Sequence, residues 1–333
     1  MITAILGTED GVVRLHDGAL EPLGLPGRQI SAVHAWRTGD AFVILAGSYG
    51  DGLFRSEDGG AHWAPITNGL TAPAFRTIAP DPLEPGAILC GTEPARIFRS
   101  RDGGLSWHEL SGIARLAGSD AWFLPYSPRA GALRNIYAPS GTRRLLASVE
   151  VGGLLDSGDG GETWSYLPVL AEADIHHITG HPDDPNLFYA SLGWAPPPGE
   201  SRAADTPPLG GLARSRDGGR TWRKFYSDYT RASIIPPARP DLVLAGPAKA
   251  VGAQGRIEVS ADGGDSWRSA EDGVESPMTD MVELFLAAPD GSIWAICSQG
   301  RLFRAEPGEW QWRSPLPATA DVRVKSAALL AEA

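Results

Sequence analysis

The sequence has few cysteines and no long apolar stretch. Its 333 residues include two cysteines, Cys90 and Cys297, each at the end of a short apolar, strand-like run. Such a cysteine ordinarily serves as a small buried hydrophobe, so we expect no disulfide framework. No run reaches the roughly eighteen apolar residues that cross a bilayer, and residues 1–10 lack the regions of a signal peptide. We therefore expect a cytoplasmic protein without a membrane partner.

Positive charge is scarce. The chain carries 29 Lys and Arg against 40 Asp and Glu, which gives a formal net charge of −11. A phosphate backbone is bound by a basic face, which this balance does not favour. The sequence therefore predicts no nucleic-acid partner. By contrast, turn-forming residues are abundant, with 41 Gly and 28 Pro, and this composition favours many short strands over helices.

One octet recurs along the chain with the pattern Ser-x-Asp-Gly-Gly-x-[Ser/Thr]-Trp. The first copy departs from the pattern because His62 replaces the Ser or Thr. A degenerate sixth copy occurs at 305–312, and a remnant at 15–18. Repeats spaced by forty to fifty residues are typical of propeller blades, so seven copies predict an all-β, seven-bladed β-propeller over residues 1–333. The five clear octets are Ser56 to Trp63, Ser100 to Trp107, Ser157 to Trp164, Ser215 to Trp222 and Ser260 to Trp267.

The residue types of the octet indicate a structural turn. An aspartate can accept hydrogen bonds from backbone N–H groups within a tight turn, and the following glycines supply the positive φ that such a turn needs. The closing tryptophan offers a large apolar surface to pack between blades. We therefore assign a structural role, not a catalytic one, to Asp58, Asp102, Asp159, Asp217 and Asp262.

Four strands per blade follow from the apolar runs around each octet. In the second blade we expect them at Ile30 to Trp36, Ala41 to Ser48, Gly52 to Arg55 and His62 to Thr67. The further inner strands are expected at Phe75 to Ala79, Leu133 to Ala138, Ile175 to Gly180, Arg231 to Ile235 and Met281 to Leu286.

The first blade has no inner strand at the N-terminus. Ile2 to Gly7 fits its second strand and Val12 to Leu15 its third. The remaining apolar run, Val322 to Leu330, is the candidate for the missing strand. Closure of the ring by this segment would pair two sheet edges that are otherwise open.

Two segments between the octets are longer than the others. Successive octets start 44, 57, 58 and 45 residues apart. We expect residues 112–131 to be an insertion between an outer strand and the next inner strand, and residues 193–210 an insertion between two strands of one blade. Both would reach the mouth of the central channel. Their aromatic residues Trp122, Phe123 and Trp194 are candidate ligand contacts, although Trp122 and Phe123 equally suit the anchoring of their own loop.

The residue after the first apolar position of each inner strand forms an equivalent set. Strand alternation points this position to one side throughout, and several basic side chains favour the wet channel over the blade interface. Such a cluster either binds an anion through bidentate hydrogen bonds or is neutralised internally by carboxylates such as Asp120, Asp174, Glu283 and Asp321. The set comprises Ser31, Arg76, Arg134, His176, Ala232, Val282 and Arg323.

Acid–base groups occur in the same region. Glu150 ends a second strand, and Asp174, His176 and His177 open the next inner strand. A carboxylate beside a histidine suits general acid–base catalysis, with Glu150, Asp174 and His176 as the candidate groups. A structural pair is the alternative. We expect no metal site, since neighbouring His176 and His177 point opposite ways on a strand.

The octets match the Asp-box, and through them the whole chain resembles the sialidase-like superfamily of BNR-repeat propellers. That superfamily includes sialidases, xyloglucanase-type glycoside hydrolases, sortilin-type receptors and the photosystem II assembly factor propeller. Sialidases use an arginine triad, a tyrosine nucleophile paired with a glutamate, and an aspartate acid/base. One arginine comes from a Phe-Arg-Ile-Pro segment, which Phe75 to Ile78 loosely resembles in the third blade. The chain is most similar to compact bacterial Asp-box propellers that are often labelled glycosyl hydrolases.

Three functions are therefore open. The first is a cofactor-free propeller that binds a small anionic or sugar-like ligand, or a carboxylate-bearing protein segment, at the channel mouth. Its contacts would be Arg76, Arg134, Arg323, Trp122, Phe123, His177, Trp194 and Glu283. The second is a glycosidase or lyase that uses the acid–base groups. The third is an assembly factor that presents its acidic surface or the Pro-rich loop at 195–208 to a protein partner.

Overall fold

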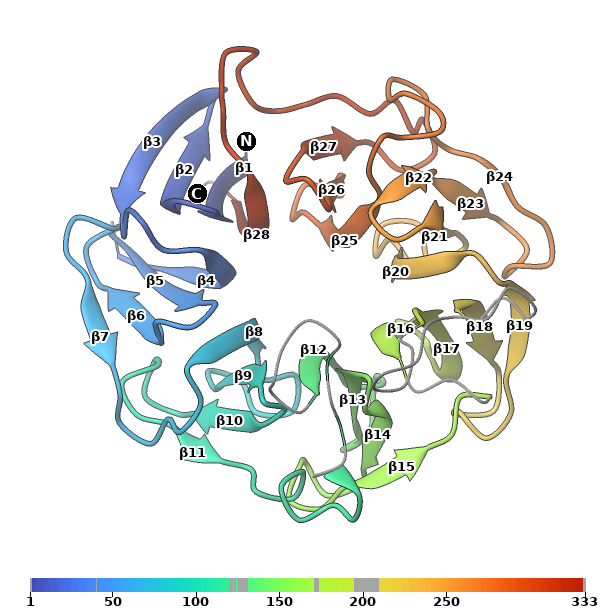
Figure 1. Ribbon diagram of the computed structural model, residues 1–333, viewed down its shortest axis with the longest axis horizontal. Coiled ribbons are helices and arrows are strands. Elements are labelled where there is room, and N and C mark those ends of the chain that lie inside the picture. The colour runs from blue at the N-terminus through green and yellow to red at the C-terminus, as the bar shows by residue number, and fades with distance from the viewer. Residues whose placement is uncertain are drawn as a thin grey trace.

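The computed structural model describes residues 2–39, 41–119, 122, 124, 131–170, 174–194 and 210–331. These residues form seven antiparallel sheets arranged in a ring about a central axis (Figure 1). The predicted all-β, seven-bladed propeller is thereby confirmed. Within the described part of the chain, no helix has the length and apolar character needed to cross a membrane.

The strands of each blade run from the channel outward in sequence order, except in the first blade. The first four blades are β28 (Val324–Ala331), β1 (Ile2–Thr8), β2 (Gly11–His16) and β3 (Ala19–Gly24); β4 (Ile30–Thr38), β5 (Ala41–Ser48), β6 (Leu53–Ser56) and β7 (Ala64–Ile66); β8 (Ala74–Pro80), β9 (Ile88–Glu93), β10 (Ile97–Ser100) and β11 (His108–Glu109); and β12 (Ala132–Tyr137), β13 (Leu145–Glu150), β14 (Gly153–Ser157) and β15 (Ser165–Leu167). The other three are β16 (Ile175–His181), β17 (Asp184–Leu192), β18 (Gly211–Ser215) and β19 (Arg223–Tyr226); β20 (Tyr229–Ile234), β21 (Val243–Ala250), β23 (Glu258–Ser260) and β24 (Arg268–Ser269), with β22 (Ala253–Gly255) paired to β21; and β25 (Val282–Ala287), β26 (Ile293–Cys297) and β27 (Leu302–Ala305).

The C-terminal strand closes the ring. β28 pairs with β1 in an antiparallel register that runs from Ile2 opposite Ala331 to Gly7 opposite Ser326. Figure 1 shows this red strand beside the blue N-terminal strand at the centre of the disc. The expected closure is confirmed, although the strand starts at Val324, two residues later than predicted.

The repeated octets form the outer turns, as the third octet illustrates. Asp159 Oδ1 accepts hydrogen bonds from the backbone N–H groups of Glu162 at 3.0 Å and Thr163 at 2.9 Å, and Asp159 Oδ2 accepts one from the Thr163 hydroxyl at 2.6 Å. These hydrogen bonds, together with one from Ser157, hold the pKa of Asp159 at about 2. The indole N–H of Trp164 donates to the Gly161 carbonyl at 2.9 Å. Each aspartate is thereby committed to its turn.

The core lies between adjacent blades. In one cluster, Leu45 and Leu53 of the second blade pack against Phe75 and Phe98 of the third, with Trp107 at the edge. Another cluster joins the last blade to the first through the Val324 side chain of β28. Each blade therefore depends on its neighbours, as in other repeat proteins.

Removal of β28 should abolish the fold. A chain that ends at Asp321 leaves the edge of β1 unpaired and loses part of the core between the last and first blades. We expect it to aggregate or to unfold well below the melting temperature of the full chain. Circular dichroism and light scattering on both proteins measure this, with deletion of residues 332–333 alone as the control. Equal melting temperatures would contradict a structural role for the closure.

Candidate ligand site in the central channel

Each inner strand carries an irregularity in its pairing near its start. In β8, for example, Phe75 lies opposite Thr92 and Thr77 opposite Gly91, so Arg76 has no direct partner. In β20, Arg231 and Ala232 together face the single residue Gly246. A residue inserted into a strand in this way is re-aimed relative to the regular pleat. The inserted residues around the ring are Ser31, Arg76, Arg134, His176, Arg231, Glu283 and Lys325.

All seven of these residues line one cavity of about 590 Å³ on the ring axis. His177 also lines it, as do apolar residues further along the inner strands. Equivalent residues of successive inner strands thus converge on a shared axial cavity, as predicted. Ser31, Arg76, Arg134 and His176 lie where the sequence pattern places them, and the other expected contacts His177 and Glu283 also line the cavity.

Three positions of the predicted set are wrong by one or two residues. The inserted residues are Arg231, Glu283 and Lys325 rather than Ala232, Val282 and Arg323. The prediction counted from the first apolar residue, and this rule misleads where the strand starts at another residue than expected: β25 and β28 start later, and β20 starts earlier. In blade six, the buried position before the insertion is the polar Thr230, so the pattern gave no signal there.

Arg323 therefore does not join the cluster. Its side chain is 57% exposed, and its Nε lies 3.8 Å from Glu9 Oε2. Lys325 takes its place in the cavity lining and pairs with Glu9 Oε1 at 2.9 Å.

Glu150 is enclosed by two of the channel arginines. Its Oε2 lies 3.4 Å from Nη1 of Arg134 and 3.5 Å from Nη2 of Arg76. On its other side, Arg76 lies 3.6 Å from Glu93, whose side chain is fully buried and accepts hydrogen bonds from the Tyr49 hydroxyl. The carboxylates Glu93 and Glu150 thus lie behind the arginines, away from the cavity.

Glu283 lies in the cavity itself and bridges two arginines. Its Oε1 accepts a hydrogen bond from Arg231 of the neighbouring blade. Its Oε2 lies 3.5 Å from Nη2 of Arg134 in blade four, which is on the far side of the ring (Figure 1). One ion pair therefore spans the channel.

Internal neutralisation of the arginines is thus observed, but largely by other residues than expected. Glu283 acts as predicted, whereas Glu93 and Glu150 replace the other anticipated carboxylates. Asp174 contacts a histidine instead, Asp321 is exposed, and Asp120 lies outside the described residues.

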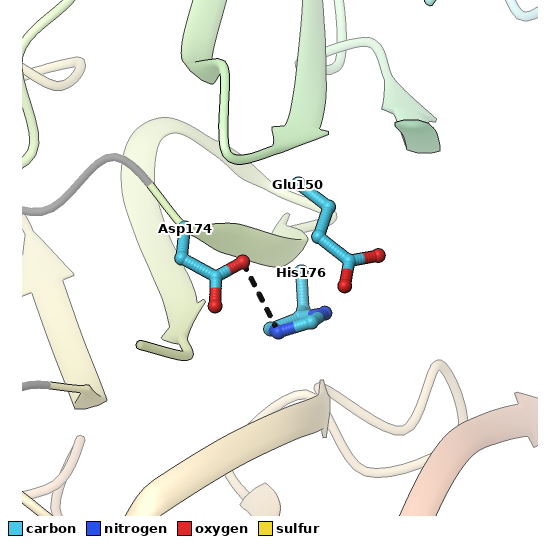
Figure 2. Close-up of side chains that lie close together, drawn as sticks. All are labelled: Glu150, Asp174 and His176. Atoms are coloured by element: carbon cyan, nitrogen blue, oxygen red, sulfur yellow. Dashed lines mark ion pairs between the residues drawn. The ribbon is translucent and has the colours of Figure 1, made fainter. Parts of the chain in front are cut away.

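The three candidate acid–base residues come together at the edge of the cluster. Glu150 ends β13, Asp174 precedes β16 and His176 is the inserted residue of β16; one ligating atom from each lies within 4.8 Å of the others. Figure 2 shows Asp174 Oδ1 directed at His176 Nε2, and the two atoms are 3.3 Å apart. The same nitrogen lies 2.9 Å from the hydroxyl of Tyr229, which accepts a hydrogen bond from Arg231 Nε at 3.0 Å.

A glycine allows this close approach. A Cβ at Gly193 would lie 2.3 Å from His176 Nε2 and 2.4 Å from Asp174 Oδ2. The Gly193 N–H also donates to the Asp174 carbonyl at 2.8 Å, which fixes the start of the inner strand. Any other residue at this position would displace the pair.

The ionisation of the site follows from these contacts. Burial alone would raise the pKa of Glu150, but attraction to Arg134, His176 and Arg76 outweighs it and holds the pKa at about 2. Burial also raises the pKa of Tyr229 well above its ordinary value. For His177, burial and the nearby charge of Arg134 lower the pKa to about 4, so its ring is neutral at pH 7.

Glu150, Asp174 and His176 form the one group among the described residues whose His, Cys, Asp or Glu atoms approach closely enough to share a metal ion. Two guanidinium groups already contact Glu150 Oε2. Their positive charge disfavours a cation at the same oxygen. The contacts therefore favour an ion-pair or acid–base arrangement over a metal centre.

The inserted loops contribute less to the cavity than expected. Trp122 packs edge-on against Tyr166, with ring centroids 6.3 Å apart, and against the core of its own blade. It therefore has the anchoring role that was the alternative. Trp194 is half-buried and is not among the cavity-lining residues. Phe123 and residues 195–209 lie outside the described residues.

The sequence patterns missed Arg231, Lys325, Tyr229, Glu93 and Tyr49. An alignment of the blades on a glycine of the second strand would have identified Lys325. Gly7, Gly47 and Gly91 each lie opposite the residue that follows the inserted one. No pattern marks Tyr229, Glu93 or Tyr49, because they act through contacts between blades.

Solved structures with a similar fold include several propellers. A GH74 xyloglucanase from Xanthomonas campestris superposes with a TM-score of 0.69 at 19% identity, over 94% of this chain and 52% of that one. YCF48 from Cyanidioschyzon merolae gives 0.61 at 17% identity, over 91% and 90%. Chaetomium thermophilum Sqt1, bound to the N-terminus of ribosomal protein L10, gives 0.56 at 13% identity, over 93% and 83%.

These likenesses show the fold. The chain spans about half the length of the GH74 proteins that it matches. No family model matches the sequence, and no curated protein does so either.

Substitution of Glu150 by Gln should destabilise the protein in a pH-dependent way. The folded-state pKa of about 2 lies below that of an unfolded chain, so the carboxylate stabilises the fold above about pH 4.5, and this contribution is lost as the pH falls toward 2. We expect Glu150→Gln to lower the free energy of unfolding by about 3 kcal/mol at pH 7, with the deficit shrinking below pH 4.

Urea unfolding of the wild type and the variant between pH 3 and pH 7 measures the deficit. The exposed Glu309 provides the control substitution Glu309→Gln. A deficit that stays constant over this range would show that the Glu150 charge does not stabilise the fold.

Proposed function

We propose that residues 1–333 act as one propeller domain that binds a small anionic or sugar-like molecule, or a carboxylate-bearing protein segment, in the central channel. The observation that carries this proposal is the convergence of Arg76, Arg134, Arg231 and Lys325 on one cavity. Their side chains are between 13% and 22% exposed there, while Glu93 and Glu150 are at most 5% exposed. A ligand therefore meets guanidinium and ammonium groups before it meets these carboxylates.

A ligand carboxylate would have to displace a carboxylate of the protein, because the cavity arginines already form internal ion pairs. Glu283 already holds Arg134 and Arg231 from within the cavity. An incoming carboxylate can contact the same guanidinium groups, since arginine presents its donors in a planar fork that suits carboxylates. Glu283 then competes with the ligand for these two guanidinium groups.

This proposal includes membership of the Asp-box, sialidase-like propellers. The hydrogen bonds of the octet aspartates support this relationship, as does the likeness to the xyloglucanase fold. Fold alone does not transfer an activity, so the function rests on the channel residues.

Loss of Arg134 should abolish binding, because this residue contacts both Glu150 and Glu283 at the centre of the cluster. For the wild type we expect the melting temperature to rise with the concentration of a carboxylate ligand found by a broad thermal-shift screen. The rise should disappear in Arg134→Gln and persist in Arg268→Gln, an exposed control far from the cavity. A screen in which no anion shifts the wild-type melting temperature would refute the proposal.

Substitution of Glu283 should have the opposite effect. Glu283→Gln removes the internal competitor and leaves its shape, so we expect the same ligand to bind about tenfold more tightly. Isothermal titration calorimetry compares the two proteins directly. An unchanged or weaker affinity would show that Glu283 does not occupy the ligand's position.

An enzyme is the second candidate, and one observation favours it: Glu150, Asp174 and His176 do come together. The glycosidase version fits poorly, because both carboxylates are buried. A glycosidic bond must lie between two carboxyl groups that both reach it. A lyase fits better, with His176, which lines the cavity, next to the Tyr229 hydroxyl as the acid–base pair.

The lyase version predicts an unsaturated product from an acidic polysaccharide, detected by its ultraviolet absorbance. Tyr229→Phe should reduce such activity at least a hundredfold, while the exposed Tyr166→Phe should not. Absence of this product over a panel of uronate polymers would rule out the lyase hypothesis.

The assembly-factor hypothesis depends mainly on the loop at 195–208, which lies outside the described residues. Its support is that Sqt1, a protein with a similar fold, binds the N-terminus of another protein.

A further inference from the structure

The channel cavity is charged at one level and apolar at another. The seven inserted residues lie near the start of the inner strands, and the strands run in the same direction around the ring. Further along these strands the half-buried lining includes the apolar residues Ala79, Leu284, Leu286 and Ala327. Because a strand advances about 3.3 Å per residue, Leu286 lies roughly 10 Å along the channel from Glu283.

The apolar lining residues come from blades one, two, three and seven. Behind the half-buried residues, the buried side chains of Val33, Ile78, Phe285 and Ile296 also border the cavity. Near the charged level the remaining polar lining includes Gln29, Ser31, Asn135 and Ser298. The apolar lining thus lies beyond the inserted residues on these four blades, whereas Asn135 and His177 are polar lining residues at that level in blades four and five.

From this two-level lining we propose that the channel takes an amphipathic carboxylate, a monocarboxylic acid with an apolar body. The carboxylate would lie at Arg134 and Arg231, and the body would extend along the channel past Leu284 and Leu286. This inference rests on the proposed function and narrows its ligand class. A ligand that is polar along its whole length would leave these leucines in contact with hydroxyl groups and gain nothing from them.

The size of the cavity agrees with such a ligand. A volume of about 590 Å³ lies within the roughly 300 to 1,000 Å³ of small-molecule sites. An unbranched acid of eight carbons can place its carboxylate at the arginines and reach the level of Leu286. Each methylene buried against the apolar lining should then tighten binding about threefold to fourfold.

The test is a calorimetric titration with acetate, butyrate, hexanoate and octanoate, beside gluconate as a polar carboxylate and 1-octanol as an uncharged chain. We expect the dissociation constant to fall along the series, with octanoate at least a hundredfold tighter than acetate. Gluconate and 1-octanol should each bind much more weakly than octanoate.

Two variants locate the apolar body. Leu286→Asn should weaken octanoate binding about tenfold more than it weakens acetate binding, and Ala327→Leu should shorten the channel and penalise octanoate more than butyrate. Leu105→Asn is the matched control, because Leu105 is exposed on an octet turn and is not among the cavity-lining residues. Melting curves establish that each variant is folded.

The outcomes separate the two proposals. Arginine-dependent binding in which gluconate equals octanoate would overturn the amphipathic ligand and leave the proposed anion site standing. Octanoate binding matched by 1-octanol, or unaffected by both channel variants, would also overturn it. If no carboxylate binds at all, the proposed function itself fails.

Discussion

Each inner strand gains one residue relative to its partner strand, and this irregularity determines what the channel contains. A regular strand would alternate its side chains between the two sides of the sheet. The insertion turns one additional side chain toward the axis, at the same height in every blade. It also leaves a backbone carbonyl unpaired, and serines of neighbouring blades satisfy several of these groups. Ser31 donates to the Phe75 carbonyl at 2.5 Å, and Ser148 donates to the His176 carbonyl at 3.2 Å.

Charge in the channel is tolerated because it alternates. From Glu93 through Arg76, Glu150 and Arg134 to Glu283, each residue contacts one of the opposite sign. Desolvation of a single guanidinium would be costly, but Arg76 and Arg134 are each compensated by two carboxylates. The same arrangement confines the carboxylates to the outer layer and leaves basic groups toward the cavity. Glu283 is the exception, because it lines the cavity itself.

Much of the scaffold could be predicted, because its turns and strands are determined by residues that are close together in the sequence. The octets specify their own turns through hydrogen bonds within eight residues, and in the second blade the apolar runs gave the strands to within about two residues. The channel was harder to predict. Thr230 is buried at a position that is apolar in most blades, so the inserted Arg231 was not recognised. Tyr229 and Glu93 were missed because they contact residues of other blades. Such contacts leave no pattern in the local sequence.

The repeats differ in residue type at the channel, where their inner strands meet around the axis. All five clear octets keep the same aspartate and tryptophan, because every outer turn must satisfy the same backbone groups. On the channel side the seven inserted residues are of five types, although they occupy one equivalent position. A need to fill the channel uniformly would be met by one apolar residue type throughout. Three arginines, a lysine, a histidine, a glutamate and a serine at a single level do not meet that need. The charged members instead form ion pairs that connect blades three, four, six and seven across the axis.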